Sequence, residues 1–212
     1  MNRFWTLLAA VPLVVNAAVE QRFDLNGEVA LEARGFFDSA LDSRQKKGDF
    51  SLRFQPEHYA EWGRNTSLTF TPFVRLDSAD DERTHADLRE FYVRHRAGAF
   101  EVRAGLRKVF WGATESAHLV DILNQTDLIE NPDTEDKLGQ PMVDLSWTND
   151  WGGTLHGFVL PYFRERTFPG VEGRLRFPLP VDTDVAAIYE SDRGEKHVDW
   201  ALRYSMTVGT LD

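Results

Sequence analysis

The stretch FDLNGEVALEARGFF, Phe23 to Phe37, alternates apolar and polar residues almost without interruption. All its odd positions are apolar residues or glycine, whereas charged residues occupy the even positions 24, 28, 32 and 34. Because successive side chains of a strand point to opposite faces, this pattern predicts a strand with one apolar and one charged face.

The same alternation recurs along most of the chain. Clear cases lie at residues 50–54, 68–76, 100–106 and 198–206. Shorter or broken cases lie at residues 88–96, 142–147, 154–163 and 184–190. The sequence therefore predicts an all-β chain of about nine strands.

The segments between these strands alternate in length. Short turns are predicted at residues 61–65, 97–99, 149–152 and 191–196. Longer polar loops are predicted at residues 38–48, 77–85, 112–140 and 164–183. This alternation is typical of an up-and-down antiparallel sheet with short turns at one rim and long loops at the other.

Composition excludes several classes of function. With a net charge of -10 and no basic run, the 212-residue chain does not resemble a nucleic-acid-binding protein. It has no cysteine, and its six histidines lack the spacing of metal ligands. No nucleophile, P-loop or dinucleotide motif occurs, so we predict no enzyme activity, no cofactor and no metal.

The N-terminus predicts export. Asn2 and Arg3 precede an apolar core from Trp5 to Val15, and Ala17 ends a small-residue cleavage pattern. The apolar run is too short to span a bilayer as a helix. We therefore predict a signal peptide at residues 1–17 and a β-barrel segment at residues 18–212.

Alternation alone does not say which face meets water. A water-soluble barrel turns its apolar face inward, whereas an outer-membrane barrel turns it toward lipid. Three features favour the membrane: strands of about ten residues, aromatic residues near strand ends, and a polar face rich in charge. We predict an up-and-down antiparallel transmembrane β-barrel, with the soluble β-barrel as the alternative.

The stretch VRAGLRKVFWGATESAHLVDILNQTDL, residues 102–128, resembles the porin-like outer-membrane families of Gram-negative bacteria. In those families a strand ends in a Trp-Gly pair, here Trp111 and Gly112, and an Asp-Ile-Leu-Asn-x-x-Asp stretch follows, here residues 121–127. The resemblance implies location in the bacterial outer membrane. It also implies contact with lipid and lipopolysaccharide, the barrel assembly machinery and small solutes, and it leaves homo-oligomerisation open.

Two features depart from a complete barrel of that kind. The chain ends Thr210-Leu211-Asp212 without the terminal aromatic residue that such barrels carry. An odd count of about nine strands does not close a single-chain bacterial barrel. We therefore predict an incomplete barrel, the N-terminal portion of a larger one.

Charged residues of different strands fall on the predicted polar face. If the apolar face meets lipid, these residues line the lumen and set its selectivity. The alternative is that they only pair across strands. The predicted pore-lining set is Arg34, Arg53, Arg75, Arg94, Arg103, Arg107, Arg203, Glu32 and Glu101.

The longest loop is strongly acidic. We hypothesise that it folds into the barrel mouth and forms a constriction opposite the arginines. The alternative is a surface loop whose carboxylates bind divalent cations of the lipopolysaccharide layer, or nothing. The predicted constriction residues are Glu115, His118, Asp121, Asn124, Asp127, Glu130, Asp133, Glu135 and Asp136.

These patterns together predict a porin-like channel for passive diffusion of small polar or amphiphilic solutes. A truncated fragment that does not close is compatible with the same patterns. The alternative function is a non-conducting structural or adhesion barrel of the outer membrane whose long loops bind a surface partner.

Overall fold

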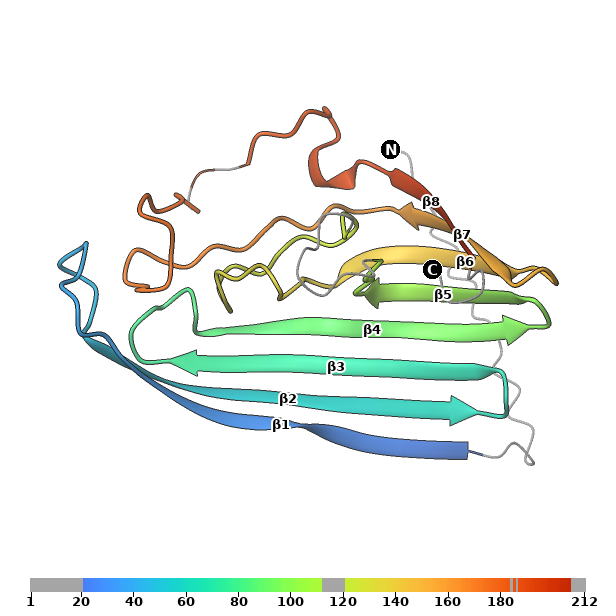
Figure 1. Cartoon of the computed structure of the whole chain (residues 1–212), viewed down its shortest axis with the longest axis horizontal. Coiled ribbons are helices and arrows are strands. Elements are labelled where there is room, and N and C mark those ends of the chain that lie inside the picture. Colours follow the sequence, from blue (N-terminus) through green and yellow to red (C-terminus); the bar gives the residue numbers. More distant parts are fainter. Residues whose placement is uncertain (1–20, 112–120, 184, 186, 207–212) are drawn as a thin grey trace, which may run out of the picture.

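Each strand of the sheet pairs with the next strand along the chain. The computed structural model describes residues 21–111, 121–183, 185 and 187–206. Within them eight strands form one sheet in sequence order (Figure 1). Their bounds are β1 Gln21–Gly35, β2 Gly48–Trp62, β3 Thr66–Asp77, β4 His85–Ala97, β5 Phe100–Arg107, β6 Gln140–Thr148, β7 Gly153–Leu160 and β8 Asp199–Met206. All neighbouring pairs are antiparallel, which confirms the predicted all-β up-and-down sheet.

Several predicted features lie outside the described residues. They are the signal peptide at residues 1–17, the loop residues Glu115 and His118, and the chain end Thr210-Leu211-Asp212. The boundary at residue 18 lies outside them too.

The connections alternate in length, as the sequence predicts. Short turns at residues 63–65, 98–99 and 149–152 join β2 to β3, β4 to β5 and β6 to β7. Long connections follow β1, β3, β5 and β7, at residues 36–47, 78–84, 108–139 and 161–198. Figure 1 shows all short turns at one end of the sheet and all long connections at the other.

The predicted strand count of about nine is wrong for the described part of the chain, which contains eight strands. The segment predicted as a strand at residues 184–190 lies in the β7–β8 connection, where residues 185 and 187–190 form no strand. Its sequence VAAI places four apolar residues in a row instead of alternating them. The turn predicted at residues 191–196 belongs to the same connection and contains a 3-10 turn, Gly194–Lys196. In the described residues the strand count is therefore even, and the odd count that supported an incomplete barrel does not hold there.

Strand β5 is shorter than the sequence pattern indicates. It ends at Arg107, four residues before Trp111, whereas the resemblance implies a strand that ends at Trp111. The Trp111 ring instead lies 5.5 Å from that of Phe158 in β7. It packs there against a small apolar cluster of Met142, Phe158 and Leu160.

The two faces of the sheet differ in composition and exposure. We call the outer face the one that carries the apolar alternate positions of every strand. Its exposed members are Phe23, Leu25, Val29, Leu31, Phe50, Leu52, Phe54, Trp62, Val74, Leu76, Phe91, Val93, Phe100, Val102, Val143, Leu145, Trp147, Val159, Trp200, Leu202, Tyr204 and Met206.

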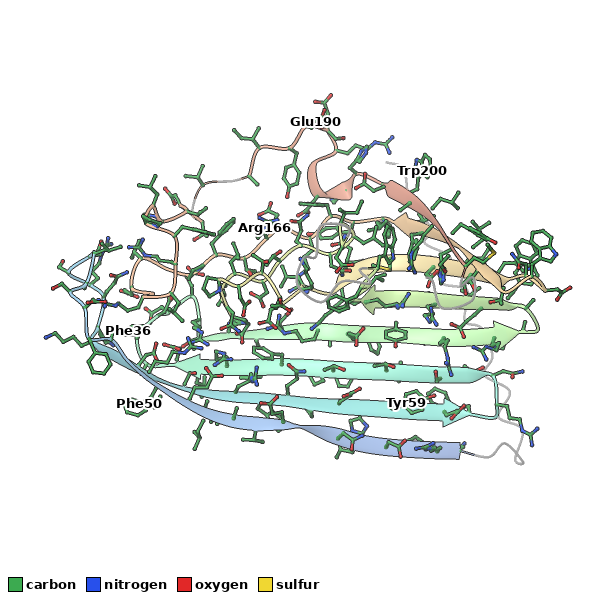
Figure 2. All side chains as sticks on the ribbon, viewed as in Figure 1. Phe36, Phe50, Tyr59, Arg166, Glu190 and Trp200 are labelled. Atoms are coloured by element: carbon green, nitrogen blue, oxygen red, sulfur yellow. The ribbon has the colours of Figure 1, made fainter. Side chains whose placement is uncertain are left out.

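The inner face carries the opposite alternate positions, and much of it is buried beneath the long connections. Its buried polar or charged members are Asp49, Ser51, Ser67, Thr69, Thr71, Arg75, Arg89, Glu101, Gln140, Asp144 and Ser146. In Figure 2, Arg166 lies among the side chains of the long connections, whereas Trp200 projects from β8 away from them.

The sheet is open in the described part of the chain, because β1 pairs only with β2 and β8 only with β7. These two strands lie at opposite sides of the sheet (Figure 1). Among the described residues, no helix is long and apolar enough to cross a membrane.

Candidate functional site: the inner face and its two covering loops

Two long connections pack against the inner face near the ends of the strands from which they leave. We call them the β5–β6 loop, residues 108–139, and the β7–β8 loop, residues 161–198. Leu128, Ile129 and Leu138 of the β5–β6 loop are buried. The β5–β6 loop also has its own short ladder, in which Asp127 N donates to Asp136 O and Leu138 N donates to Gln125 O, both at 2.8 Å. This loop is therefore built against the sheet.

The predicted pore-lining residues share the inner face. Arg34 and Glu32 belong to β1, Arg53 to β2, Arg75 to β3, Arg94 to β4, Arg103, Arg107 and Glu101 to β5, and Arg203 to β8. The antiparallel register places them on one side, since Arg94 pairs with Arg103 and Arg53 pairs with Arg75. Such neighbours repel one another unless carboxylates lie between them.

Carboxylates of the same face supply that compensation toward the short-turn end. Glu101 lies within 4.0 Å of Arg94 and 3.1 Å of Arg96, and it also pairs with Arg103. Asp144 of β6 pairs with Arg103 at 3.1 Å and with Arg107 at 2.9 Å. The four guanidinium groups share two carboxylates, so this group of residues is strongly polar and has an excess of positive charge.

Arg203 and Arg53 complete the predicted set. The Arg203 guanidinium lies 6.0 Å from the centre of the Trp111 ring, a cation–π contact at the edge of its range. Arg53 pairs with Glu28 of β1, and Arg34 pairs with Glu32 at 3.0 Å. Each residue of the set thus has a described partner.

Arg75 is the centre of the contact between the sheet and the β5–β6 loop. Its Nε donates to Glu130 Oε1 at 3.0 Å and its Nη2 donates to Glu130 Oε2 at 2.6 Å, a two-pronged ion pair. Nη1 donates to Ser51 Oγ at 2.8 Å and lies 3.1 Å from Glu32. Arg75 is 1% exposed and Glu130 is 3% exposed, so this pair is shielded from solvent. Such a pair fixes the position of the loop, because either charge alone is costly to bury.

Arg89 forms a second contact to the same loop through Asp127. The Arg89 guanidinium pairs with Asp127 and lies 3.0 Å from Asp87. Burial alone would raise the pKa of Asp127, but the Arg89 charge and a hydrogen bond from Thr167 outweigh it and lower that pKa. Asp127 of the β5–β6 loop is therefore held as a carboxylate between Arg89 of the sheet and Thr167 of the β7–β8 loop.

A third arginine, Arg83, comes from the β3–β4 connection. Its Nη1 donates to Asp77 at 3.2 Å, and its Nη2 lies 3.3 Å from Glu32. Nη2 is also 3.5 Å from the backbone oxygen of Glu130, at the limit of a hydrogen bond. Arg75, Arg83 and Arg89 together surround Asp127 and Glu130 of the β5–β6 loop.

Asn124 joins the two ends of the β5–β6 loop to each other and to the end of β5. Its Oδ1 accepts from Val109 N at 2.8 Å, and its Nδ2 donates to Arg107 O at 2.7 Å and to Leu138 O at 2.9 Å. Asp121 accepts a hydrogen bond from Trp111 N. These two predicted constriction residues therefore act on the loop backbone and not on the arginines of the sheet.

The remaining described constriction residues fall into two groups: those that contact the loop itself and those that contact arginines of the inner face. Asp133 is exposed and accepts from Glu135 N at 3.1 Å, and Asp136 accepts from Asn131 Nδ2 at 3.0 Å. Of the described acidic residues predicted in this loop, Asp127 and Glu130 meet arginines of the inner face. The acidic composition of the loop does not distinguish these two residues from the carboxylates that contact only the loop.

No sequence pattern indicates that the β7–β8 loop also packs inward. Arg164 pairs with Asp87 of β4 and donates to Gly139 O at 3.2 Å. Thr167 Oγ1 donates to Asp127 Oδ1 at 2.6 Å, and Gly170 N donates to the Asp80 carboxylate at 3.1 Å. The two loops therefore interlock, with Asp127 shared between them.

Arg89 and Asp144 are the main inner-face residues that the sequence prediction missed. Arg89 is the extra residue of a β-bulge, since Glu90 pairs with Thr71 and Leu88 pairs with Pro72. A bulge shifts the alternation by one residue, so counting places Arg89 on the wrong face. Asp144 alternates correctly with Met142 and Ser146, and its position was available from the pattern.

One group in the described part of the chain has the composition of a metal site. Oxygen and nitrogen atoms of His85, Asp127 and Glu130 lie within 4.8 Å of one another. Arg75 and Arg89 already pair with the two carboxylates, and they would repel a cation at the same place. The residues therefore do not fit a metal ion.

Comparison with known proteins adds no relative. No protein-family model, no curated protein and no solved structure matches the chain. Function must therefore be inferred from the two faces of the sheet and from the loops that cover one of them.

Proposed function

We propose that this protein is a β-barrel of the bacterial outer membrane and a porin-like channel, with its outer face in lipid and its inner face toward the lumen. The observation that carries the proposal is the inverted order of the two faces. Leu31 on the outer face is 85% exposed, whereas Arg75 on the inner face is 1% exposed. Lipid is the solvent in which this order is favourable.

The extent of the outer face supports lipid as its environment. Exposed apolar residues occur on every one of the eight strands. Monomeric proteins in water rarely expose an apolar surface that extends over eight strands, because such a surface causes association. A bilayer covers the whole surface without any specific partner.

Aromatic residues at one end of the sheet fit the same environment. Trp62, Phe100 and Trp147 are exposed on the outer face next to short turns, and Trp151 is exposed within one of them. Indole and phenyl rings are favoured at the boundary between lipid and water. The short-turn end of the sheet would then lie at one membrane surface.

The inner face supports a hydrated passage that narrows toward the loop end. At the short-turn end, Arg96, Glu101, Arg103, Ser146 and His156 belong to the lining of an open recess of about 570 Å³. At the loop end, the ion pairs of Arg75 and Arg89 hold the β5–β6 loop against the wall. This geometry suits slow passive diffusion of small polar or amphiphilic solutes past charges of both signs.

A non-conducting barrel is the second candidate. The burial of Arg75 and Glu130 favours it, because the loops there are held by pairs closed to solvent. In that case the loops act as a plug, and their outer surfaces are the functional part.

Membrane fractionation of the expressed chain tests the membrane assignment. We expect the chain in the outer-membrane fraction, released only by detergent, with a gel mobility that changes on heating as a folded barrel denatures. Recovery of folded chain from the periplasm without detergent would contradict the proposal and favour a water-soluble β-protein.

Planar-bilayer conductance then separates a channel from a plug. We expect discrete conductance steps, and larger steps for the double variant Arg89→Ala/Asp127→Ala, which releases one loop contact without leaving a lone buried charge. Asp133→Ala, an exposed change in the same loop, serves as the control and should leave the steps unchanged. Absence of conductance in both the native chain and the double variant would favour the non-conducting barrel.

A further inference from the structure

Within the described residues, each of the two outermost strands of the sheet has an edge that pairs with no other strand. In the described part of the chain, β1 pairs only with β2 and β8 only with β7. Both strands also carry exposed apolar residues, such as Leu31 at 85% and Trp200 at 78% exposure. If these residues lie in lipid, the backbone groups of both edges lie there too, where nothing but another strand satisfies them.

Pairing of β1 with β8 of the same chain does not solve this problem. A barrel of eight strands has an interior just wide enough for its own side chains. Here the inner face is already covered by backbone, since Leu128, Ile129 and Leu138 of the β5–β6 loop are buried against it. The β7–β8 loop packs on the same side through Thr167 and Gly170. The barrel that contains both loops needs more than eight strands.

We propose that a second copy of this chain supplies those strands, with β8 of each copy pairing with β1 of the other. The inference rests on the proposed membrane location. An up-and-down sheet with an even number of strands has antiparallel edges, so two copies with the same orientation in the membrane close a ring of antiparallel strands. Their apolar faces then form one outer surface and their loops share one lumen.

One register joins the two edges with apolar pairs on the outer face. If Leu202 of β8 lies opposite Val29 of β1, the outer face also pairs Trp200 with Leu31 and Met206 with Leu25. All six residues are exposed in the described chain.

On the inner face, the same register brings Arg203 opposite Glu28, which is an exposed carboxylate of β1. On the outer face it also places Tyr204 opposite Gly27, where there is no side chain to obstruct the ring. The apolar pairs outside and the pair of Arg203 with Glu28 inside favour this alignment. Asp199 then lies opposite Glu32, whose carboxylate already pairs with Arg34 and Arg75.

The absence of cysteine from the chain allows a direct test by engineered disulfides. Two singly substituted chains, Val29→Cys and Leu202→Cys, are produced together with their signal and extracted from membranes after mild oxidation. We expect a covalent dimer that contains one chain of each kind. Either substituted chain produced alone should give little dimer, because equal positions do not meet in this arrangement.

A doubly substituted chain, Val29→Cys/Leu202→Cys, distinguishes the other ways to pair the edges. We expect it to form disulfides between two chains. A disulfide within one chain would show a self-closed barrel and overturn the proposal. Val29→Cys/Phe54→Cys, whose two positions are partners in the β1–β2 ladder, serves as the oxidation control within one chain.

If that control oxidises while no bond forms between positions 29 and 202, the edges do not meet and the proposal fails. The membrane assignment is unaffected by this outcome, since detergent-dependent extraction of the same chains tests it separately. Recovery of these chains from the periplasm would contradict the membrane assignment instead.

Discussion

The outer and inner faces of this sheet differ in a way that reverses the usual order of a protein in water. On β4, Val93 is 43% exposed on the outer face, while the neighbouring inner position Arg94 lies among the charges around Glu101. The outer face has no described loop against it, whereas the inner face is held by buried ion pairs. The difference indicates that the apolar face owes its stability to its surroundings and the polar face to specific partners within the chain.

Loss of the ion pair between Arg75 and Glu130 on the inner face should have the largest effect on stability. Glu130→Ala leaves Arg75 buried with only the partly exposed Glu32 as a charged partner. We expect a loss of about 3–5 kcal/mol in the free energy of unfolding, measured by urea titration in detergent with tryptophan fluorescence. Asp133→Ala in the same loop should change it little, because that carboxylate is exposed. Equal effects of the two changes would contradict the ion-pair account.

A charge on the outer face should have the next largest effect. In water, Val93→Lys at a 43% exposed position would be nearly neutral. In lipid we expect a cost of about 2–4 kcal/mol in the free energy of unfolding and less folded barrel in the membrane fraction. Gln55→Lys is the matched control on the inner face of β2, where a hydrated lumen tolerates charge. If both variants fold equally well, the two faces do not have different solvents.

Protonation of Asp127 should have a smaller effect, confined to acid pH. Arg89 and Thr167 lower the pKa of Asp127 despite its burial, so its carboxylate contributes stability above the unfolded pKa, near 4. This contribution is lost as the pH falls through the folded pKa. We expect the native chain to be more stable than Asp127→Asn at pH 7, with the difference shrinking below about pH 4. A difference that does not depend on pH would show that the charge is unimportant.

The exposed pair of the β1–β2 connection should have the smallest effect. Arg44 Nη2 lies 2.8 Å from Asp42, and hydrogen bonds from Arg44 lower the pKa of Asp42. Both groups are in water, so Asp42→Ala should leave the unfolding curve unchanged within error. A clear destabilisation would show that this pair supports the contact between the β1–β2 connection and the β7–β8 loop, in which Gln45 Nε2 donates to Gly173 O at 2.7 Å.

The alternation of residues predicts most of the sheet, because each strand has one apolar and one polar face and the period of two is a property of the backbone. Counting through β1 places Arg34 and Glu32 correctly, and the alternating connection lengths predict the up-and-down order. The acidic composition of the β5–β6 loop is the basis of a separate hypothesis, that the loop lies opposite the arginines; in the structure Glu130 pairs with Arg75 and Asp127 with Arg89.

The errors occur where a residue depends on contacts distant in the sequence. Arg89 sits at a bulge that only the pairing of β3 with β4 reveals. Trp111 follows a strand that ends early, because Asp121 and Asn124 bind the backbone of residues 109–111. The β7–β8 loop packs inward through single contacts such as Thr167 to Asp127, for which no sequence pattern exists.

The central claim is that the outer face contacts lipid, and spin labels test it most directly. The chain has no cysteine, so Val93→Cys and Gln55→Cys each give one labelled site, on the outer and inner face respectively. In membranes, we expect the label at residue 93 to collide more with dissolved oxygen, which concentrates in lipid, than with a water-soluble nickel complex. The label at residue 55 should show the reverse preference. Strong collision of the label at residue 93 with the nickel complex would place the outer face in water and contradict the account.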